Sequence, residues 1–181
     1  MNKTNASPAQ PACLAIIALG SNLGDPRKNV LDAIQRLDGL SDFPLRKSSL
    51  WESAPVDCPP DSPQFINAVA GLVPLHQETP ESLLAKLQQI EKEFGRQAKK
   101  IHNEPRPLDL DLIVFGNETR FSDRLTLPHP RALGRRFVLQ PLSEIAPDLI
   151  WPGSKRTVAQ LLKQLPAEPR VQRVNSIAGQ G

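Results

Sequence analysis

The chain has 181 residues, of which 39% are hydrophobic and 23% are charged, and its net charge is +3. This length and balance predict one globular domain and scarcely allow two. Two cysteines are too few for a disulfide framework or a four-cysteine zinc site, so we expect a reducing, cytoplasmic setting. No dense Lys/Arg block and no apolar run of roughly 20 residues occurs, so neither nucleic acid nor a membrane is an expected partner.

Polar, small residues fill positions 1–12, which we expect to be a disordered tail. Residues 13–19 are almost all apolar and predict a buried strand. This strand ends in Gly20–Asn22, a small and polar corner. Such a corner is either a plain turn or a surface on which a ligand lies. It is not a phosphate-binding P-loop, because the Gly-x-x-x-x-Gly-Lys-Ser/Thr pattern is absent.

The next segments predict a helix followed by two strands. Asp25 is a natural N-cap and Pro26 a natural first helical residue. Apolar residues then recur at helical spacing, so the helix is predicted over residues 26–39. Residues 45–53 and 65–73 predict two strands, which a proline-rich loop connects.

A second helix and a central strand follow. Thr79 is the expected N-cap and Pro80 the first helical residue, and Gly95 follows the end of the helix. Because the third helical position holds Ser82 rather than an acid or amide, we expect an incomplete capping box. Residues 108–116, LDLDLIVFG, alternate at first and then become fully apolar, as in a central strand.

The element order to this point is β-α-β-β-α-β, which predicts an α+β, ferredoxin-like core. In this fold the helices cover one face of the sheet, and the other face is free for additional elements or a site. We expect additional C-terminal strands and helices, with helices near residues 137–145 and 157–165. One domain is predicted over residues 13–165, and residues 166–181 are expected to be a loose tail.

Asp109 and Asp111 are the most informative pair in the sequence. Being two apart in a strand, they point to the same side, with Cα atoms about 6.6–6.8 Å apart. Two neighbouring carboxylates repel each other and lose hydration, which raises at least one pKa. Mg²⁺ removes this conflict and commonly uses one or two carboxylates together with substrate phosphates. The pair therefore indicates either a magnesium–phosphate site or an exposed sheet face that carries two acids.

Basic residues lie next to this pair in the sequence. Arg96 and Arg106 flank the preceding loop, with Lys99 and Lys100 between them. Guanidinium groups bind phosphate oxygens with two parallel donors. The loop is therefore suited to a metal–polyphosphate complex, although a solvated basic loop would have the same composition.

Five further residues have a possible binding role. His129 lies between prolines and is either a phosphate ligand, a proton shuttle or a structural residue, and Arg135 and Arg136 follow it. Phe65 and Asn67 share one side of a predicted strand. An aromatic ring and an amide can stack on and read a flat heterocycle, but a core Phe beside an ordinary Asn is also consistent.

Five stretches carry a resemblance to a known family: ALGSNLGDP, SPQFINAVA, IEKEFGR, PRPLDLDLIVFG and LTLPHPRALGRRFVLQPLSEIAPDL. Together they resemble the 6-hydroxymethyl-7,8-dihydropterin pyrophosphokinases over about residues 13–165. The resemblance implies transfer of the β,γ-diphosphate of ATP to the hydroxymethyl group of a dihydropterin in folate biosynthesis, with release of AMP. It implies ATP and this pterin as partners and two Mg²⁺ ions as cofactor, and we expect a monomer.

The resemblance also implies roles for individual residues. Asp109 and Asp111 match the metal-binding pair, and Arg96, Arg106 and Asp111 are the expected catalytic groups. The ATP side is expected to contain Glu91, Leu112, Arg124, Thr126, His129 and Arg135. The pterin pocket is expected to contain Ser53, Ala54, Val56, Phe65, Asn67 and Phe137. In this pocket the pterin lies between two aromatic rings, and Asn22 is expected to order the nearby loop.

The chain departs from some members of the family in the loop that precedes Arg106. Where those members carry further arginines and a Trp-Gly, this chain has Ala98, His102, Asn103 and Glu104. The residue after the histidine, a tyrosine in some members, is Pro130. These departures keep open the alternative of a non-catalytic pterin or nucleotide binder. A ferredoxin-like RNA-binding module would need exposed aromatics, yet only 4% of residues are aromatic and Tyr is absent.

Overall fold

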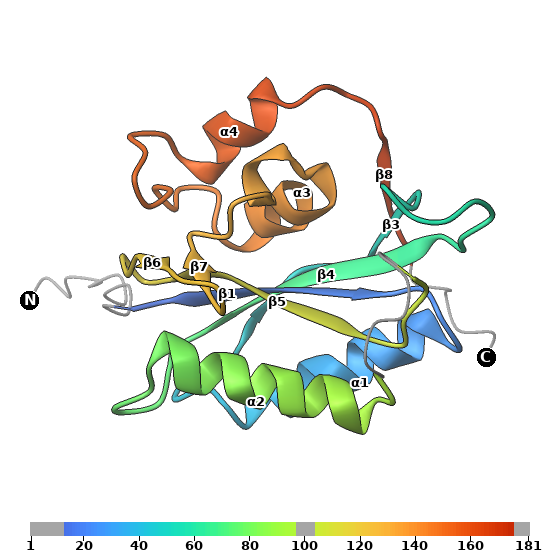
Figure 1. Ribbon diagram of the computed structural model, residues 1–181. Helices are drawn as coiled ribbons and strands as arrows, with labels where there is room; N and C mark the ends of the chain where they lie inside the picture. Colours follow the sequence, from blue (N-terminus) through green and yellow to red (C-terminus); the bar gives the residue numbers. More distant parts are fainter. Residues whose placement is uncertain (1–12, 97–103, 176–181) are drawn as a thin grey trace, which may run out of the picture.

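The structure is a computed structural model that describes residues 13–96 and 104–175, and it has a mixed α/β fold (Figure 1). Its helices are α1 (Pro26–Asp38), α2 (Pro80–Glu93), α3 (Arg136–Ile145) and α4 (Val158–Gln164), and a short 3-10 turn covers Ala132–Gly134. Its strands are β1 (Ala15–Ser21), β2 (Arg46–Lys47), β3 (Trp51–Ser53), β4 (Phe65–Leu72), β5 (Asp109–Phe115), β6 (Arg120–Phe121), β7 (Thr126–Leu127) and β8 (Val171–Arg173). Within the described residues, none of the helices has the length and hydrophobicity that a membrane crossing requires.

The main sheet is antiparallel, with strand order β5-β1-β4-β3-β8 and with β2 also paired to β4. Strands β6 and β7 form a separate hairpin. The register places Gly20 of β1 opposite Asn67 of β4 on one side and opposite Asp109 of β5 on the other. Three positions that the sequence analysis identified are therefore neighbours across the sheet.

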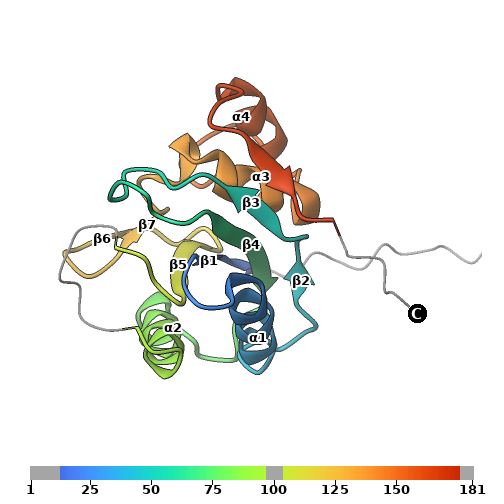
Figure 2. The same cartoon turned by 90° about the vertical axis from the view of Figure 1, so that its right-hand side faces the viewer.

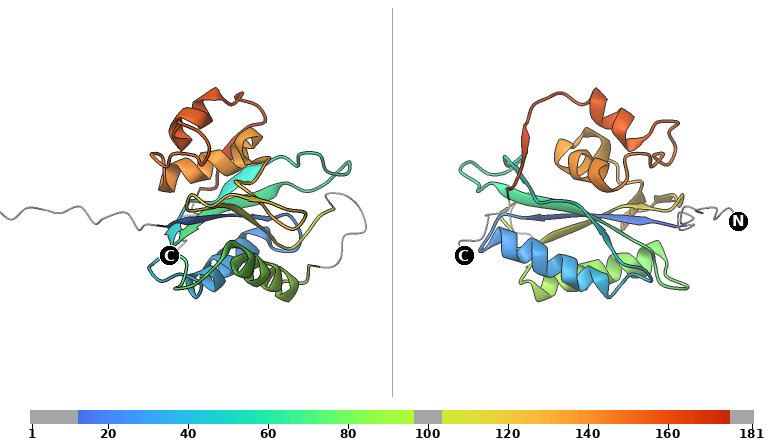
Figure 3. Two further views of the ribbon diagram at one scale, coloured as in Figure 1. Left: turned by 60° about the vertical axis from the view of Figure 1, so that its left-hand side comes forward. Right: turned by 180° about the vertical axis from the view of Figure 1, so that it is seen from behind.

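Helices cover both faces of this sheet. Figures 2 and 3 show α1 and α2 side by side on one face, with α3 and α4 over the other. Leu110 and Leu112 of β5 belong to the core beneath α1 and α2, whereas Leu139 of α3 belongs to the second core. Because side chains alternate along a strand, Asp109 and Asp111 point to the face that carries α3.

The helix starts follow the predicted capping chemistry, with one correction. The Asp25 side chain accepts a hydrogen bond from the backbone N–H of Lys28 at 3.0 Å, so its prediction as N-cap is confirmed. At α2, Thr79 Oγ1 accepts from Ser82 N at 3.1 Å, and Ser82 Oγ accepts from Thr79 N at 3.0 Å. The expectation of an incomplete capping box is wrong, because the serine hydroxyl supplies the acceptor that an acid or amide would.

The strand predicted over residues 45–53 is two short strands, β2 and β3. The break lies at Ser48, whose backbone N–H donates to Val69 O at 3.0 Å and whose Oγ accepts from Val69 N at 2.9 Å. The N–H of Ser49 then donates to Glu144 Oε2 at 2.7 Å. A side chain replaces a backbone carbonyl in the ladder, and such a replacement leaves no mark in the hydrophobic pattern.

The C-terminal segment also differs from its prediction. Within residues 166–181, expected to be a loose tail, the segment Val171–Arg173 forms β8 and pairs with β3. The N–H of Val174 extends this pairing by donating to Leu50 O at 2.8 Å. A strand of three residues is too short to show a period of two, so sequence patterning did not detect it. The tail expected at residues 1–12 lies outside the described residues.

Candidate functional site

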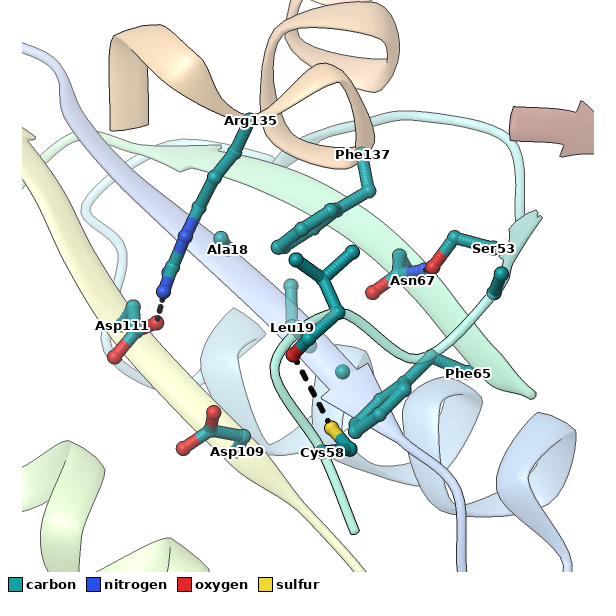
Figure 4. A pocket seen from close by; sticks show the side chains of 13 residues that line it. Ala18, Leu19, Ser53, Cys58, Phe65, Asn67, Asp109, Asp111, Arg135 and Phe137 are labelled. Carbon is teal, nitrogen blue, oxygen red and sulfur yellow. Dashed lines mark hydrogen bonds and ion pairs between the residues drawn. The ribbon is translucent and has the colours of Figure 1, made fainter. Parts of the chain in front are cut away.

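A pocket opens on the face of the sheet that carries α3 (Figure 4). Its lining comes from β1, from β3 and the loop after it, from β4, from β5 and from the start of α3. The lining residues are Ala18, Leu19, Gly20, Ser53, Ala54, Val56, Cys58, Phe65, Asn67, Asp109, Asp111, Arg135 and Phe137.

The predicted acid pair lies on one side of this pocket. The side chains of Asp109 and Asp111 are 24% and 37% exposed, so both are accessible to a ligand. Burial, and next the charge of Asp109, raise the pKa of Asp111 to about 6 against the opposing effect of Arg135. The conflict between the two carboxylates that the sequence predicts is therefore present in the structure.

Three arginines surround these acids. Arg96 Nη1 donates to Asp109 Oδ1 at 2.7 Å, and Arg106 Nη1 lies 3.4 Å from Asp109 Oδ2. Arg135 Nη1 lies 3.7 Å from Asp111 Oδ2 (Figure 4). The arrangement concentrates positive charge beside two carboxylates. It is suited to a ligand that carries several phosphate groups.

Two aromatic rings line the other part of the pocket. Phe65 projects from β4 and Phe137 from the start of α3, and Asn67 lies between them in the view of Figure 4. Asn67 Nδ2 donates to Ser53 Oγ at 2.8 Å, which fixes the orientation of the amide and leaves its oxygen on the pocket side. A flat, polar ring fits such a slot, since aromatic faces stack on it and the amide reads its edge.

The small corner after β1 connects the loops around this pocket. Asn22 is 2% exposed, its Oδ1 accepts from Arg106 N at 2.9 Å, and its Nδ2 donates to Pro63 O at 3.2 Å. The prediction that Asn22 orders a loop near the pocket is confirmed. At Gly20 an added Cβ would lie 3.4 Å from Asn67 Oδ1 and 3.7 Å from Phe65 Cδ1, so the glycine keeps this part of the pocket open.

Glu91 of α2 lies behind the acid pair rather than in the pocket. Glu91 is 6% exposed, and its Oε1 accepts hydrogen bonds from Leu110 N at 2.7 Å and from Arg96 Nη1. Burial raises the pKa of Glu91 to about 7, although the Leu110 N–H and the charge of Arg96 both act to lower it.

The other residues expected on the ATP side do not line the pocket. Leu112 is in the core beneath α1 and α2, so its side chain points away from the site. Arg124 is exposed at the turn between β6 and β7, and Thr126 is half-buried in β7. The N–H of His129 donates to Ile113 O at 2.9 Å.

The His129 ring also has a partner: its Nδ1 accepts from Arg131 N at 3.2 Å. The loop residues Ala98, Lys99, Lys100, His102 and Asn103 lie outside the described residues. The structure therefore brings together the residues expected in the pterin pocket, the acid pair and Arg96, Arg106 and Arg135, whereas the other residues expected on the ATP side lie outside this pocket.

Sequence reasoning missed some residues that line the pocket. Ala18 and Leu19 belong to β1, and Cys58 reaches the pocket from the loop after β3, where its Sγ lies 3.3 Å from Val56 O. The small residues at positions 18 and 20 were a usable signal, because two small side chains on the same side of a buried strand indicate a close approach. Cys58 has no such signal, since nothing in the sequence tells where its loop folds.

The acid pair with its arginines and the adjoining aromatic slot are suited to a class of protein that binds a phosphate compound beside a flat ring. The model of the 7,8-dihydro-6-hydroxymethylpterin-pyrophosphokinase (HPPK) family matches residues 16–147. The chain belongs to this family.

Curated relatives agree with this assignment. The chain is 42% identical over 151 residues to the 2-amino-4-hydroxy-6-hydroxymethyldihydropteridine pyrophosphokinase of Haemophilus influenzae. This match covers 83% of this chain and 91% of the Haemophilus protein. The protein of the same name from Pseudomonas aeruginosa is 40% identical, with 84% and 91% covered. Folic acid synthesis protein fol1 of Pneumocystis carinii is 43% identical over 150 residues. This match covers 82% of this chain but only 20% of the much longer fol1 protein.

Solved structures show the same fold at low identity. HPPK-DHPS of Plasmodium falciparum, crystallised with SDX-DHP, matches with a TM-score of 0.67 at 13% identity. The match covers 84% of this chain and 44% of the Plasmodium chain. At this identity the likeness concerns the fold alone.

Proposed function

We propose that this chain carries out the diphosphate transfer for which its family is named. It transfers the β,γ-diphosphate of ATP to the hydroxymethyl group of 6-hydroxymethyl-7,8-dihydropterin in folate biosynthesis and releases AMP. The observation that carries this proposal is one pocket in which Asp109 and Asp111 lie beside the rings of Phe65 and Phe137. A metal–phosphate site and a heterocycle site next to each other are what this transfer needs.

The pterin is proposed to lie between Phe65 and Phe137. Its polar edge faces Asn67 and the Ser53 hydroxyl, whose mutual hydrogen bond of 2.8 Å holds the amide in one orientation. Ala54 and Val56 form the exposed rim at the same end of the pocket. Backbone groups of this rim add further donors and acceptors.

The acid pair is suited to Mg²⁺. Among the described residues no group of three or more His, Cys, Asp or Glu side chains forms a metal site. Asp109 and Asp111 would supply two carboxylates and leave the remaining positions to phosphate and water, which is how Mg²⁺ is commonly bound. We propose that this pair holds two Mg²⁺ ions with ATP. The metal would neutralise phosphate charge and lower the pKa of the pterin hydroxyl.

The side chains then have separate roles in the transfer. The hydroxymethyl oxygen attacks the β-phosphorus, the bond from this phosphorus to the oxygen of the α-phosphate breaks, and AMP leaves. Asp111 accepts the hydroxyl proton. Arg96 and Arg106, which already lie against Asp109, stabilise negative charge on the transferred group.

The nucleotide is proposed to extend from Arg135 toward the β6–β7 hairpin. Arg124, Thr126 and His129 are the proposed contacts there. Leu112 contributes its backbone only, because its side chain is buried in the opposite core. Glu91 is proposed to act on the nucleotide side of the site through its ion pair with Arg96.

A direct assay tests the proposed reaction. The purified chain is incubated with ATP, MgCl₂ and 6-hydroxymethyl-7,8-dihydropterin, and we expect AMP and the pterin diphosphate to appear in equal amounts. Omitting the pterin or chelating the metal should stop both products. Pterin binding in calorimetry without any AMP would instead support the non-catalytic alternative.

The oligomeric state, the location in the cell and the type of fold belong to the same proposal. We propose that the chain acts as a monomer in the cytoplasm. The sheet order β5-β1-β4-β3, with α1 and α2 on one face, supports a ferredoxin-like core to which β8, α3 and α4 are added.

A further inference from the structure

Glu91 connects α2, Arg96 and the strand that carries the acid pair. Its side chain is 8% exposed, which leaves it almost no surface for a ligand. It lies two residues before the last residue of α2. Carboxylates are rarely buried to this extent unless they are paired and hydrogen-bonded, so the partners of Glu91 decide its role.

The first partner is the backbone of β5. The N–H of Leu110 donates to Glu91 Oε1 at 2.7 Å. Among the described strands β5 pairs only with β1, so an N–H on its outer edge has no strand to pair with, and the Leu110 N–H pairs with Glu91 instead. Leu110 lies between Asp109 and Asp111, and the hydrogen bond therefore fixes the backbone from which both acids project.

The second partner is Arg96. Its Nη1 donates to Glu91 Oε1 and, at 2.7 Å, to Asp109 Oδ1. Its backbone N–H also donates to Glu91 O at 3.0 Å. The guanidinium thus bridges one buried carboxylate and one carboxylate of the pocket. If Asp109 gives up its share to a ligand, the hydrogen bond to Glu91 still keeps Arg96 at the site.

We propose that Glu91 is a positioning residue, which acts through Arg96 and the β5 backbone and does not itself contact the nucleotide. It holds the guanidinium beside the acid pair before the substrates arrive, so less ordering is needed when they bind. This inference rests on the proposed function for the role of Arg96. It deepens that function by assigning the contact with phosphate to Arg96 and the positioning of Arg96 to Glu91.

Glu91→Gln separates the two partners of the carboxylate. The amide keeps an oxygen that accepts from Leu110 N–H, but it loses the charge that pairs with Arg96. The matched control is Glu93→Gln on the same helix, because Glu93 is exposed and pairs with Arg36. We expect Glu91→Gln to lower kcat/KM by on the order of 10- to 100-fold and Glu93→Gln to leave it unchanged.

A double-mutant cycle with Arg96→Ala tests whether the effect passes through Arg96. We expect Glu91→Gln to cause no further loss of kcat/KM in the Arg96→Ala background. A direct contact with the nucleotide would cause the same loss in both backgrounds and would overturn the proposal. A lower melting temperature with unchanged kcat/KM would show a purely structural role and would also overturn it.

A second measurement needs no turnover. In the free, full-length protein, the side-chain ¹⁵N–¹H signal of Arg96 is assigned by its absence in Arg96→Ala. We expect Glu91→Gln to shift this signal toward that of a solvent-exposed arginine, with no shift in Glu93→Gln. An unmoved signal contradicts the positioning role, whereas a chain that makes no AMP contradicts the proposed function and leaves this measurement valid.

Discussion

Arg135 lies over the ring of Phe137, with its guanidinium carbon 5.4 Å from the ring centroid. The same arginine faces Asp111, at 3.7 Å between Nη1 and Oδ2. Arg106 repeats this relationship on the other side of the pocket: it lies 5.8 Å from the centroid of Phe65 and 3.4 Å from Asp109. Each aromatic wall of the pocket is therefore linked to one acid through an arginine, so the two halves of the site are physically connected.

This link predicts that Phe137→Leu affects both substrates. Loss of the ring removes stacking with the pterin and also the face against which Arg135 packs. We expect KM for the pterin to rise about tenfold or more and kcat to fall, measured by AMP release. The matched control is Phe43→Leu, at a ring that is 60% exposed and remote from the pocket. A rise in the pterin KM with unchanged kcat would contradict the link through Arg135.

The acid pair supports a prediction in which activity and stability change in opposite directions. Because burial and Asp109 raise the pKa of Asp111 to about 6, the ionised carboxylate is disfavoured in the folded protein. A raised carboxyl pKa means that the folded state binds more protons, so this group weakens stability as pH rises through about 6.

Asp111→Asn should therefore abolish AMP formation while the metal-free protein is at least as stable as wild type at pH 7.5. Enzyme assays and urea unfolding measure the two effects, and Asp38→Asn on an exposed position of α1 is the control. Full activity in Asp111→Asn would remove this residue from the metal and catalytic sets. A large loss of stability would show that its charge is compensated in the folded state.

The acid pair and the pterin slot differ in how far sequence reasoning reaches. Alternation in LDLDL predicts that Asp109 and Asp111 share a side, and the same rule pairs Phe65 with Asn67. Phe137 could not be found in this way, because it lies on a helix that follows the sheet and meets the pocket only through tertiary packing. Only the resemblance to a family indicated its role.

The fold shows the same limit. The long periodic elements α1, α2 and β5 were predictable, because each shows enough turns or alternations to define a period. The split between β2 and β3 was not, since it depends on the side-chain hydrogen bond between Ser48 and Val69. The burial of Glu91 was also hidden, because its partners are Leu110 of β5 and Arg96, which lies beyond the end of α2.

His129 supports a prediction about pH. Burial, and next the positive charges of Arg135 and Arg131, lower the pKa of His129 from its ordinary value of 6.5 to about 4, although Asp109 acts in the opposite direction. Below pH 6.5 the unfolded chain therefore binds more protons at this position than the folded chain does. Stability is lost as pH falls from 6.5 toward 4.

His129→Asn should remove this loss. When the pH falls from 7 to 5, we expect the free energy of unfolding of wild type to decrease by about 1 kcal/mol more than that of the variant, allowing for partial solvent screening. Urea unfolding at both pH values measures the change, with His76→Asn as a control on the loop before α2. An equal pH dependence in wild type and His129→Asn would mean that this histidine is not kept neutral by its surroundings.

Asn22 allows a test of how the loops around the pocket are held. Its side chain accepts from Arg106 N at 2.9 Å and donates to Pro63 O at 3.2 Å, so one buried amide connects the loop before β4 to the segment before β5. Asn22→Ala leaves the Arg106 N–H without its acceptor and should cost about 1 to 3 kcal/mol of stability.

Asn22→Asp distinguishes the two connections. The carboxylate keeps the acceptor for Arg106 N–H but cannot donate to Pro63 O, so the loop before β4 is released while Arg106 stays in place. Since that loop carries the rim beside Phe65, we expect KM for the pterin to rise several-fold with kcat nearly unchanged. Asn22→Ala should lower kcat as well, because Arg106 N–H then loses its acceptor, and the hydrogen bond from Asn22 N to Arg106 O at 3.2 Å is all that still joins the two residues. Asn117→Ala, at an exposed turn, is the matched control, and identical kinetics for the two Asn22 variants would show that the connection to Arg106 has no part in catalysis.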